Sequence, residues 1–152
     1  MALLRDVHDA DGYPMVWPAD PAAWLAGKDD LAAWVDEQDG AVFGHLSLRR
    51  IDAARSAPVW REALPVPAER LAVVSRFFVS TRARRQGIGG ALMTRAEEHA
   101  AEEDLRLVLD VATDSHASIE FYERRGWRRV GPAELPLSGD RGTLQVVVFA
   151  LG

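Results

Sequence analysis

Hydrophobic and polar positions along the chain predict a mixture of strands and helices. The run from Leu71 to Val79 is apolar at most positions, which is typical of a strand buried on both faces. Arg106 to Val111 has the same character over a shorter length. Leu31 to Glu37 and Ala41 to Arg49 flank the turn Gln38-Asp39-Gly40, and an Asp-Gly pair between two such runs predicts a β-hairpin.

Alternate positions of the second hairpin strand predict that both of its faces are covered. One face carries Val42, Gly44, Leu46 and Leu48, and the other carries Phe43, His45 and Ser47. Apolar residues on both faces indicate a strand well inside a sheet. We expect His45, as a strand residue, to be structural rather than catalytic, and His8 and His99 to be exposed or structural.

Two later segments have the period of an amphipathic helix. From about Gln86 to Glu103, apolar residues recur on one face at Ile88, Leu92, Ala96 and Ala100. A second helix is predicted from about His116 to Arg125. Asp114 or Ser115 is its expected N-cap, and Gly126 stands where a helix commonly ends.

The N-terminal segment gives weaker signals. We interpret Ala2 to Val7 as a short first strand. Asp9 to Pro21 is rich in proline and is interpreted as mostly loop. Asp20 precedes a proline, and the pair predicts a short helix from Pro21 to Leu25 or Ala26.

The segment from Ile51 to Glu69 is interrupted by prolines and is interpreted as an irregular loop. It is either functional or a surface excursion with Trp60 packed onto the core. The last predicted strands are Trp127 to Val130 and Thr143 to Ala150, separated by a loop with Pro132, Pro136 and Gly139. This order of elements indicates an α/β (α+β) fold with a mixed sheet, in a single domain over residues 1–152.

Composition narrows the class of protein. The chain has 152 residues, of which 48% are hydrophobic and 27% charged, and these values are typical of a globular domain. A net charge of −5 argues against a nucleic-acid surface. The chain has no cysteine and no metal-ligand spacing of carboxylates, so we expect no disulfide, no cysteine nucleophile and no metal. It has no apolar run of membrane length, and residues 1–6 lack the long apolar region of a secretory signal, so we expect a cytoplasmic protein.

Candidate chemistry is concentrated where the Leu71–Val79 strand meets the next helix. Gly87, Gly89 and Gly90 stand at the start of that helix, and arginines at positions 82, 84 and 85 precede them. A helix N-terminus presents N–H groups without helical partners, and glycine lets an anion approach them closely. A phosphate or pyrophosphate is the expected occupant, although the spacing fits neither a P-loop nor a complete dinucleotide fingerprint. The alternative is an ordinary glycine-rich turn.

The sequence Arg84-Arg85-Gln86-Gly87-Ile88-Gly89 resembles the acetyl-CoA pyrophosphate loop, R-x-x-G-x-G, of the GCN5-related N-acetyltransferase (GNAT) superfamily. Further along, Tyr122-Glu123-Arg124-Arg125-Gly126-Trp127 resembles the next signature of that superfamily. Two motifs in the right order are more specific than either alone, and the resemblance covers roughly Leu71 to Val130. It implies the GNAT fold, in which a mixed, mostly antiparallel sheet is flanked by helices.

The resemblance also implies roles for individual residues by position. Phe77, Phe78 and Val79 match the strand segment that pairs with the pantetheine arm and points an N–H toward the thioester carbonyl. The pyrophosphate loop is matched by Arg84, Arg85, Gln86, Gly87, Ile88, Gly89 and Gly90. Ser115 stands where the family often has an asparagine near the coenzyme. Tyr122 matches the tyrosine beside the coenzyme sulfur, which implies both a coenzyme contact and the catalytic acid.

Direct acetyl transfer to an amine needs a base, an oxyanion site and an acid. An alkylamine with a pKa of about 10.4 is mostly protonated at neutral pH, so a proton must be removed. A strand N–H can stabilise the oxyanion, and a tyrosine hydroxyl can protonate the departing thiolate. The base stays open, because Val73 occupies the position of the glutamate that some family members use. Candidates by proximity in sequence are Glu69, Ser75, Asp110 and His116, and a base acting through ordered water is equally compatible.

The resemblance therefore implies an enzyme that transfers acetyl from acetyl-CoA, its co-substrate, to a primary amine of a small molecule, peptide or protein. Two alternatives stay open: a transferase that uses another acyl-CoA or a hydroxyl acceptor, and a catalytically weak CoA-binding module. The region where this superfamily builds acceptor pockets contains Trp17, Trp24, Trp34 and Trp60, although a core or surface role is the default for each. The resemblance also allows a homodimer, which no motif in this chain decides.

Overall fold

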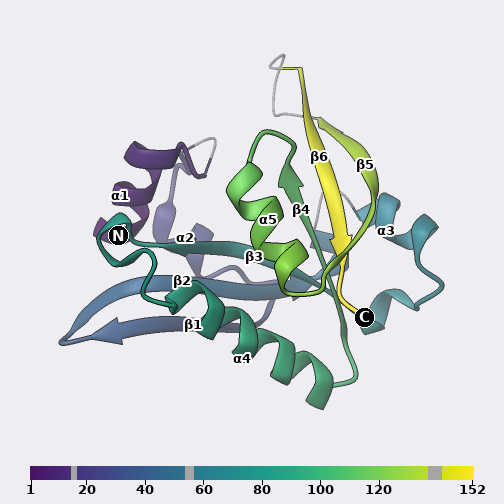
Figure 1. Cartoon of the computed structure of the whole chain (residues 1–152), viewed down its shortest axis with the longest axis horizontal. Helices are drawn as coiled ribbons and strands as arrows, with labels where there is room; N and C mark the ends of the chain where they lie inside the picture. Colours follow the sequence, from purple (N-terminus) through teal and green to yellow (C-terminus); the bar gives the residue numbers. More distant parts are fainter. Residues whose placement is uncertain (15–16, 54–56, 137–141) are drawn as a thin grey trace. The chain divides into compact units, whose positions relative to one another are not determined.

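The structure, a computed structural model, describes residues 1–14, 17–53, 57–136 and 142–152 (Figure 1). These residues form two compact units. The first unit holds residues 1–49 and 74–99, and the second unit holds residues 50–73 and 100–152. One strand, β3 (Leu71–Val79), begins in the second unit and continues in the first.

The first unit contains two N-terminal helices, a hairpin and most of a long helix. Its elements are α1 (Ala2–Asp11), α2 (Pro21–Leu25), β1 (Asp30–Gln38), β2 (Ala41–Arg50), η3 (Thr81–Ala83) and α4 (Ile88–Glu102). β1 pairs antiparallel with β2, and β2 lies next to β3. The hairpin and the interior position of its second strand are confirmed.

The second unit contains the remaining strands and shorter helices. Its elements are η1 (Ile51–Ala53), α3 (Ala57–Ala63), η2 (Ala68–Arg70), β4 (Arg106–Ala112), α5 (His116–Arg124), β5 (Arg128–Pro136) and β6 (Thr143–Ala150). The start of β3 pairs parallel with β4, while β6 pairs antiparallel with both β4 and β5 (Figure 1). The described sheet is therefore mixed and mostly antiparallel, which confirms the expected fold class.

Each unit has a hydrophobic cluster of its own. In the first unit, Leu4 and Val7 of α1 pack with Phe78 of β3. In the second unit, the cluster includes Ile51, Trp60, Leu71, Val73, Val108, Val146 and Val148. Removal of this apolar surface from water is the main favourable contribution to folding.

Turn and cap signals predicted several element ends correctly. Asp20 accepts a hydrogen bond from the Ala23 N–H at 3.0 Å, and α2 begins at Pro21 as expected. Asp39 and Gly40 both have positive φ angles, of 51° and 79°, which suit a tight hairpin turn. Gly126 follows α5 with a φ of 85°.

The N-terminal residues 2–7 are helical, so the prediction of a first strand is wrong. α1 ends at Asp11 and is capped by Gly12, whose φ of 70° is left-handed and whose N–H donates to the carbonyl of His8 at 2.8 Å. Leu4 and Val7 are buried, and a spacing of three residues places both on one helix face. A short apolar run is compatible with either element, and packing decides between them.

The prediction of an irregular loop across Ile51 to Glu69 is also wrong, because α3 forms within it. Pro58 lies in the first turn of α3, where proline removes no hydrogen bond that the helix could make. Trp60 is completely buried. The alternative in which Trp60 packs onto the core is therefore confirmed.

The strand β5 is longer than predicted and contains Pro132 and Pro136, which were expected in a loop. β5 lies at the end of the strand order, next to β6 alone. Proline is tolerated in an edge strand, because the N–H that it lacks has no ladder partner on the outer side. Gly139 of the expected loop lies outside the described residues.

Candidate functional site

The turn between β3 and α4 presents the glycine motif at the surface. Residues 84–87 are exposed, and α4 begins at Ile88 rather than at Gln86. Gly87 has a φ of 80°, a left-handed conformation that glycine adopts without strain. The Ala91 N–H donates to the Gly87 carbonyl at 3.0 Å, so the preceding amides at the start of α4 have no acceptor within the helix.

Close packing places the start of α4 against the sheet. A Cβ added at Gly89 would contact atoms of Phe77 and Val79 at 3.4 and 3.5 Å, so this glycine faces the end of β3. A Cβ at Gly44 of β2 would lie only 2.8 Å from Cγ2 of Ile88. The structure thus brings the predicted strand segment and the predicted loop together.

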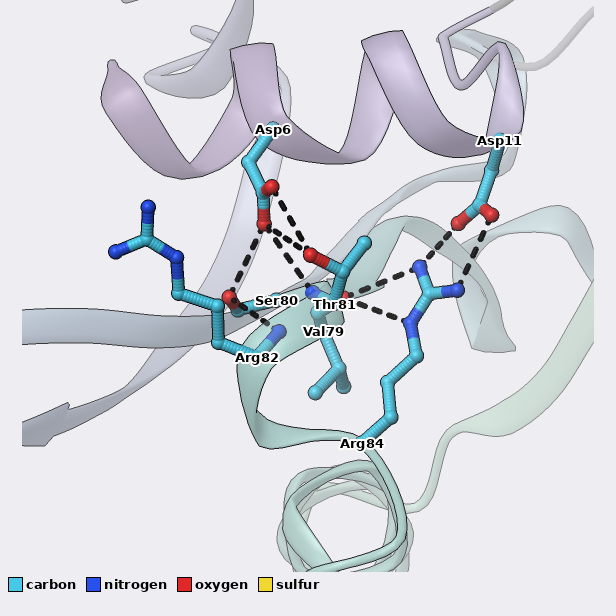
Figure 2. Close-up of polar contacts among 7 residues, drawn as sticks. All are labelled: Asp6, Asp11, Val79, Ser80, Thr81, Arg82 and Arg84. Atoms are coloured by element: carbon cyan, nitrogen blue, oxygen red, sulfur yellow. Dashed lines mark hydrogen bonds and ion pairs between the residues drawn. The ribbon is translucent and has the colours of Figure 1, made fainter.

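The residues that follow β3 are held by Asp6 of α1 (Figure 2). Its carboxylate accepts hydrogen bonds from the Ser80 hydroxyl at 3.1 Å, from the Thr81 N–H at 3.2 Å and from the Thr81 hydroxyl at 2.9 Å. The Ser80 oxygen in turn accepts the N–H of Arg82 at 3.2 Å. These bonds, led by that of the Thr81 hydroxyl, lower the pKa of Asp6. They fix the path of the chain into the glycine turn.

The side chain of Arg84 contacts protein groups rather than only solvent (Figure 2). Its Nη1 donates to Oδ1 of Asp11 at 3.1 Å, and its Nη2 contacts the second oxygen of that carboxylate. Nε and Nη2 each lie 3.4 Å from the carbonyl oxygen of Val79. The hydrogen bonds to Asp11 raise the pKa of Arg84. α1 therefore holds the turn at two places, through Asp6 and through Asp11.

Arg76 interrupts the regular path of β3 just before Phe77. Its φ of 50° lies outside the strand region, and a non-glycine residue adopts this conformation only where its surroundings enforce it. Two side chains of β2 bond to this part of β3: His45 Nδ1 lies 2.7 Å from the Arg76 carbonyl oxygen, and the Ser47 hydroxyl donates to the Ser75 carbonyl at 3.1 Å. They hold β3 where the segment Phe77–Val79 begins.

The side chain of Arg76 is buried, with only 6% of its surface exposed. Nη1 donates to Oδ1 of Asp30 at 2.9 Å, and the guanidinium lies over the ring of Trp24 at 5.0 Å. A Cβ at Gly27 would approach Nη1 to 2.5 Å, so the guanidinium fills the space beside that glycine. A lone arginine in an apolar strand signals a buried partner, but the sequence does not say which carboxylate it is.

Tyr122 and Ser115 belong to the second unit. The ring of Tyr122 is buried on α5, with ring centroids of Trp127 and Phe149 each 5.8 Å away. These aromatic neighbours fix the orientation of the phenol ring. Ser115 is the N-cap residue of α5, but its side chain makes no capping hydrogen bond.

The profile of the family described as "Acetyltransferase (GNAT) family" matches residues 3–127. The chain belongs to the GNAT acetyltransferase family. It is therefore an enzyme of the acyltransferase class, as the two motifs indicated. The matched residues include both motifs and the α1 carboxylates that hold the glycine turn.

Solved structures share the GNAT fold at low sequence identity. An N-acetyltransferase from Staphylococcus aureus Mu50 is 20% identical, with a TM-score of 0.70 over 99% of this chain and 90% of that chain. NAA60 of Arabidopsis thaliana, solved with a bisubstrate analogue, is 15% identical, with a TM-score of 0.72 over 99% and 90%. A Bacillus anthracis protein solved with acetyl coenzyme A is 16% identical, with a TM-score of 0.63 over 88% and 68%. No curated protein matches the sequence.

The GNAT resemblance left the general base open, and the candidates lie in different places. Val73, at the position of the glutamate of some members, is buried at 4% exposure. Ser75 is in β3, where its carbonyl accepts a hydrogen bond from the Ser47 hydroxyl. The remaining candidates all lie in the second unit: Glu69 in η2, Asp110 in β4 and His116 at the start of α5.

Sequence reasoning missed Asp6 and Asp11, and it gave His45 no part in the site. Their partners are far away in the chain, so no local spacing signals them. Among the described residues, no group of three or more His, Cys, Asp or Glu side chains could hold a metal ion. In the same residues, no helix has the length and apolar character needed to cross a membrane.

Proposed function

We propose that this GNAT protein transfers the acetyl group of acetyl-CoA directly to a primary amine of a small molecule, peptide or protein. The observation that carries the proposal is the exposed turn at residues 84–87, where Gly87 is left-handed and precedes the α4 amides that have no acceptor within the helix. A thioester is already activated, so the transfer needs no protein nucleophile. We propose that residues 1–152 act as one domain, and that the protein works in the cytoplasm.

In this proposal the residues of the turn bind the pyrophosphate of the coenzyme. The amides of Gly87, Ile88, Gly89 and Gly90 donate to phosphate oxygens, and the N-terminal end of α4 adds partial positive charge. Arg85 and Gln86 are exposed beside these amides. Arg84 contributes positive charge and, through Asp11 and Val79, keeps the turn in place.

The strand and the aromatic residue of the second motif act on the thioester end. Backbone groups of Phe77, Phe78 and Val79 pair with the pantetheine arm, and one N–H stabilises the oxyanion of the tetrahedral intermediate. Ser115 provides a further coenzyme contact. The hydroxyl of Tyr122 protonates the departing thiolate, whose conjugate acid has a pKa of about 8.5 in a free thiol.

A second candidate function is a catalytically weak CoA-binding module. The observation that favours it is the buried Val73 at the position of the family's glutamate. A binding module would keep the turn and its anion contacts while lacking a base for the acceptor amine. A transferase with a longer acyl-CoA or a hydroxyl acceptor differs from the main proposal only in its substrates.

Binding and turnover separate these functions. We expect CoA to raise the melting temperature of the protein and acetyl-CoA to release free thiol in the presence of an accepted amine. Thiol release is measured across panels of amines, alcohols and acyl-CoA donors. Stabilisation by CoA without thiol release from any combination would favour the binding module. Absence of both would contradict the proposal.

A further inference from the structure

His45 is a buried imidazole whose protonation pattern is fixed by one contact. Only 8% of the residue is exposed, and its Nδ1 lies 2.7 Å from the carbonyl oxygen of Arg76. A carbonyl oxygen can only accept a hydrogen bond, so Nδ1 must carry the proton. In the neutral ring, Nε2 then holds a lone pair and is a proton acceptor.

The ring of His45 lies against the strand segment that is proposed to hold the thioester. It stacks on Phe78 with a centroid distance of 5.3 Å and an interplanar angle of 15°. The carbonyl that it contacts belongs to Arg76, next to Phe77. The same histidine therefore fixes the irregular part of β3 and lies beside its functional end.

The surroundings of His45 favour the neutral form. Burial is the largest cause of a lowered pKa, because an imidazolium loses its hydration there. The charged groups facing it act in opposite directions: Asp30 of β1 raises the pKa and Arg76 of β3 lowers it. Nε of Arg49 in β2 lies 3.4 Å from Oδ1 of Asp30, and the ring of Tyr13, before α2, lies tilted against Phe78 with a centroid distance of 6.0 Å.

We propose that His45 is the general base of the acetyl transfer, with Nε2 accepting a proton from the attacking nitrogen of the acceptor. This rests on the proposed function and gives that site the base that its sequence motif lacks. The acceptor amine is then bound on the face of the sheet that His45 shares with Phe78. His45 is at once a structural residue, as expected from its strand, and a catalytic one.

The protons and bonds of the step balance. His45 Nε2 takes one proton from the acceptor ammonium, and the neutral nitrogen forms a C–N bond to the thioester carbon. The C–S bond breaks, and the thiolate takes the proton of the Tyr122 hydroxyl. After the C–N bond forms, the nitrogen loses a second proton to solvent, and the Tyr122 phenolate takes one proton up from solvent. The proton on His45 is then released to solvent. One acetyl amide, one CoA thiol and one free proton result.

Two substitutions at His45 separate the base from the structural contact. The amide nitrogen of asparagine can occupy the place of Nδ1 and still donate to the Arg76 carbonyl, but asparagine cannot accept a proton. We expect both His45→Asn and His45→Ala to lower kcat by about 100-fold or more, which is the usual loss for a general base. KM for acetyl-CoA should change less than threefold in His45→Asn. The acidic limb of kcat/KM, set by a pKa below 6.5 in the wild type, should disappear in both.

His8→Asn is the matched control, because His8 Nδ1 also contacts a backbone carbonyl oxygen, that of Pro14 at 2.8 Å. It should keep the wild-type kcat and the acidic limb. Wild-type turnover and pH dependence in His45→Asn, with losses only in His45→Ala, would overturn the base and leave a structural contact. Absence of thiol release by the wild type with any acceptor would instead overturn the proposed function, and the base with it.

Discussion

Gly87 and Gly89 are two residues apart but have different physical reasons to be glycine. Gly87 needs its φ of 80°, and an added Cβ there would meet no atom within 4 Å. Gly89 has no such φ, and its Cβ would make ordinary contacts with Phe77 and Val79 at 3.4 and 3.5 Å. Conformation requires the first glycine, whereas the second leaves room for a methyl group on the side facing the sheet.

We therefore predict that Gly87→Ala and Gly89→Ala have different effects on the free energy of unfolding. Gly87→Ala should lower stability by about 1–2 kcal/mol, the cost of a left-handed residue with a Cβ, and weaken coenzyme binding. Gly89→Ala should keep coenzyme affinity and leave stability equal or up to about 1 kcal/mol higher, because alanine favours helix. Thermal melts and isothermal titration with CoA measure both. Equal loss of affinity in the two variants would count against the described turn.

Tyr122→Phe is predicted to lower kcat much more than coenzyme affinity. The ring contacts with Trp127 and Phe149 do not involve the hydroxyl, so both variants keep them. Loss of a general acid lowers turnover by about 100-fold to 10,000-fold. Steady-state kinetics with CoA titration measures both quantities. Unchanged turnover would remove Tyr122 as the acid.

At the scale of elements, α1 both packs on β3 and holds the residues that lead into the glycine turn. Asp6 connects it to Thr81, the first residue of η3, and Asp11 connects it to Arg84, which directly follows η3 (Figure 2). The position of the glycine turn at residues 84–87 thus depends on a helix that lies more than 70 residues earlier in the sequence. Substitutions of these two α1 carboxylates should therefore weaken coenzyme binding.

Asp6→Asn is predicted to lower the melting temperature and raise the Kd for CoA, because one oxygen that accepts hydrogen bonds is lost. Asp9→Asn, the same change at an exposed position of α1, is the control and should change neither. The pKa of Asp6 lies below the ordinary 3.8, so its contribution to stability is complete above that value and is lost as the pH falls through the lower, folded-state pKa. The difference in melting temperature between wild type and Asp6→Asn should therefore shrink below about pH 4. A constant difference down to pH 2 would contradict the assignment.

Gly44→Ala is predicted to disturb the packing of α4 on β2. The new methyl group would lie 2.8 Å from Ile88 Cγ2 and 2.9 Å from Leu92 Cδ1, so these side chains or the start of α4 must shift. We expect a loss of about 1–3 kcal/mol, which is typical of overpacking, together with weaker CoA binding. Gly131→Ala in β5 is the control, because a Cβ there would meet nothing within 4 Å. Denaturant melts and CoA titrations report the result, and wild-type behaviour of Gly44→Ala would show that the contact is easily relieved.

At the scale of the whole molecule, β3 and α4 each contribute residues to both units. Because these two elements are divided, neither unit contains all of β3 or all of α4. We predict that residues 1–152 unfold in one transition, with coincident circular dichroism and tryptophan fluorescence. CoA at 100 times its Kd should stabilise the wild type by about 2.7 kcal/mol and leave Gly87→Glu unaffected. Two resolved transitions would contradict the single-domain proposal.

Local signals predicted most of the elements but misassigned three segments. The apolar run of β3, the Asp-Gly hairpin and the Asp20 cap rest on neighbours in sequence, and each was placed correctly. The predictions for residues 2–7, α3 and β5 are wrong for a common reason. A short apolar run, or a segment with a proline, is compatible with a helix, a strand or a loop. In α1 the choice was made by burial of Leu4 and Val7, and in β5 by its place at the edge of the sheet.

The sequence by itself determined the family and the glycine-rich start of the helix after β3, because a glycine motif at a helix N-terminus is a local arrangement of backbone groups. Only the tertiary structure decided what holds that turn and which histidine lies beside the strand. Asp6 reaches Thr81, and His45 reaches the Arg76 carbonyl, across long stretches of chain. Contacts of this kind follow from how the elements pack, which no spacing between neighbouring residues encodes.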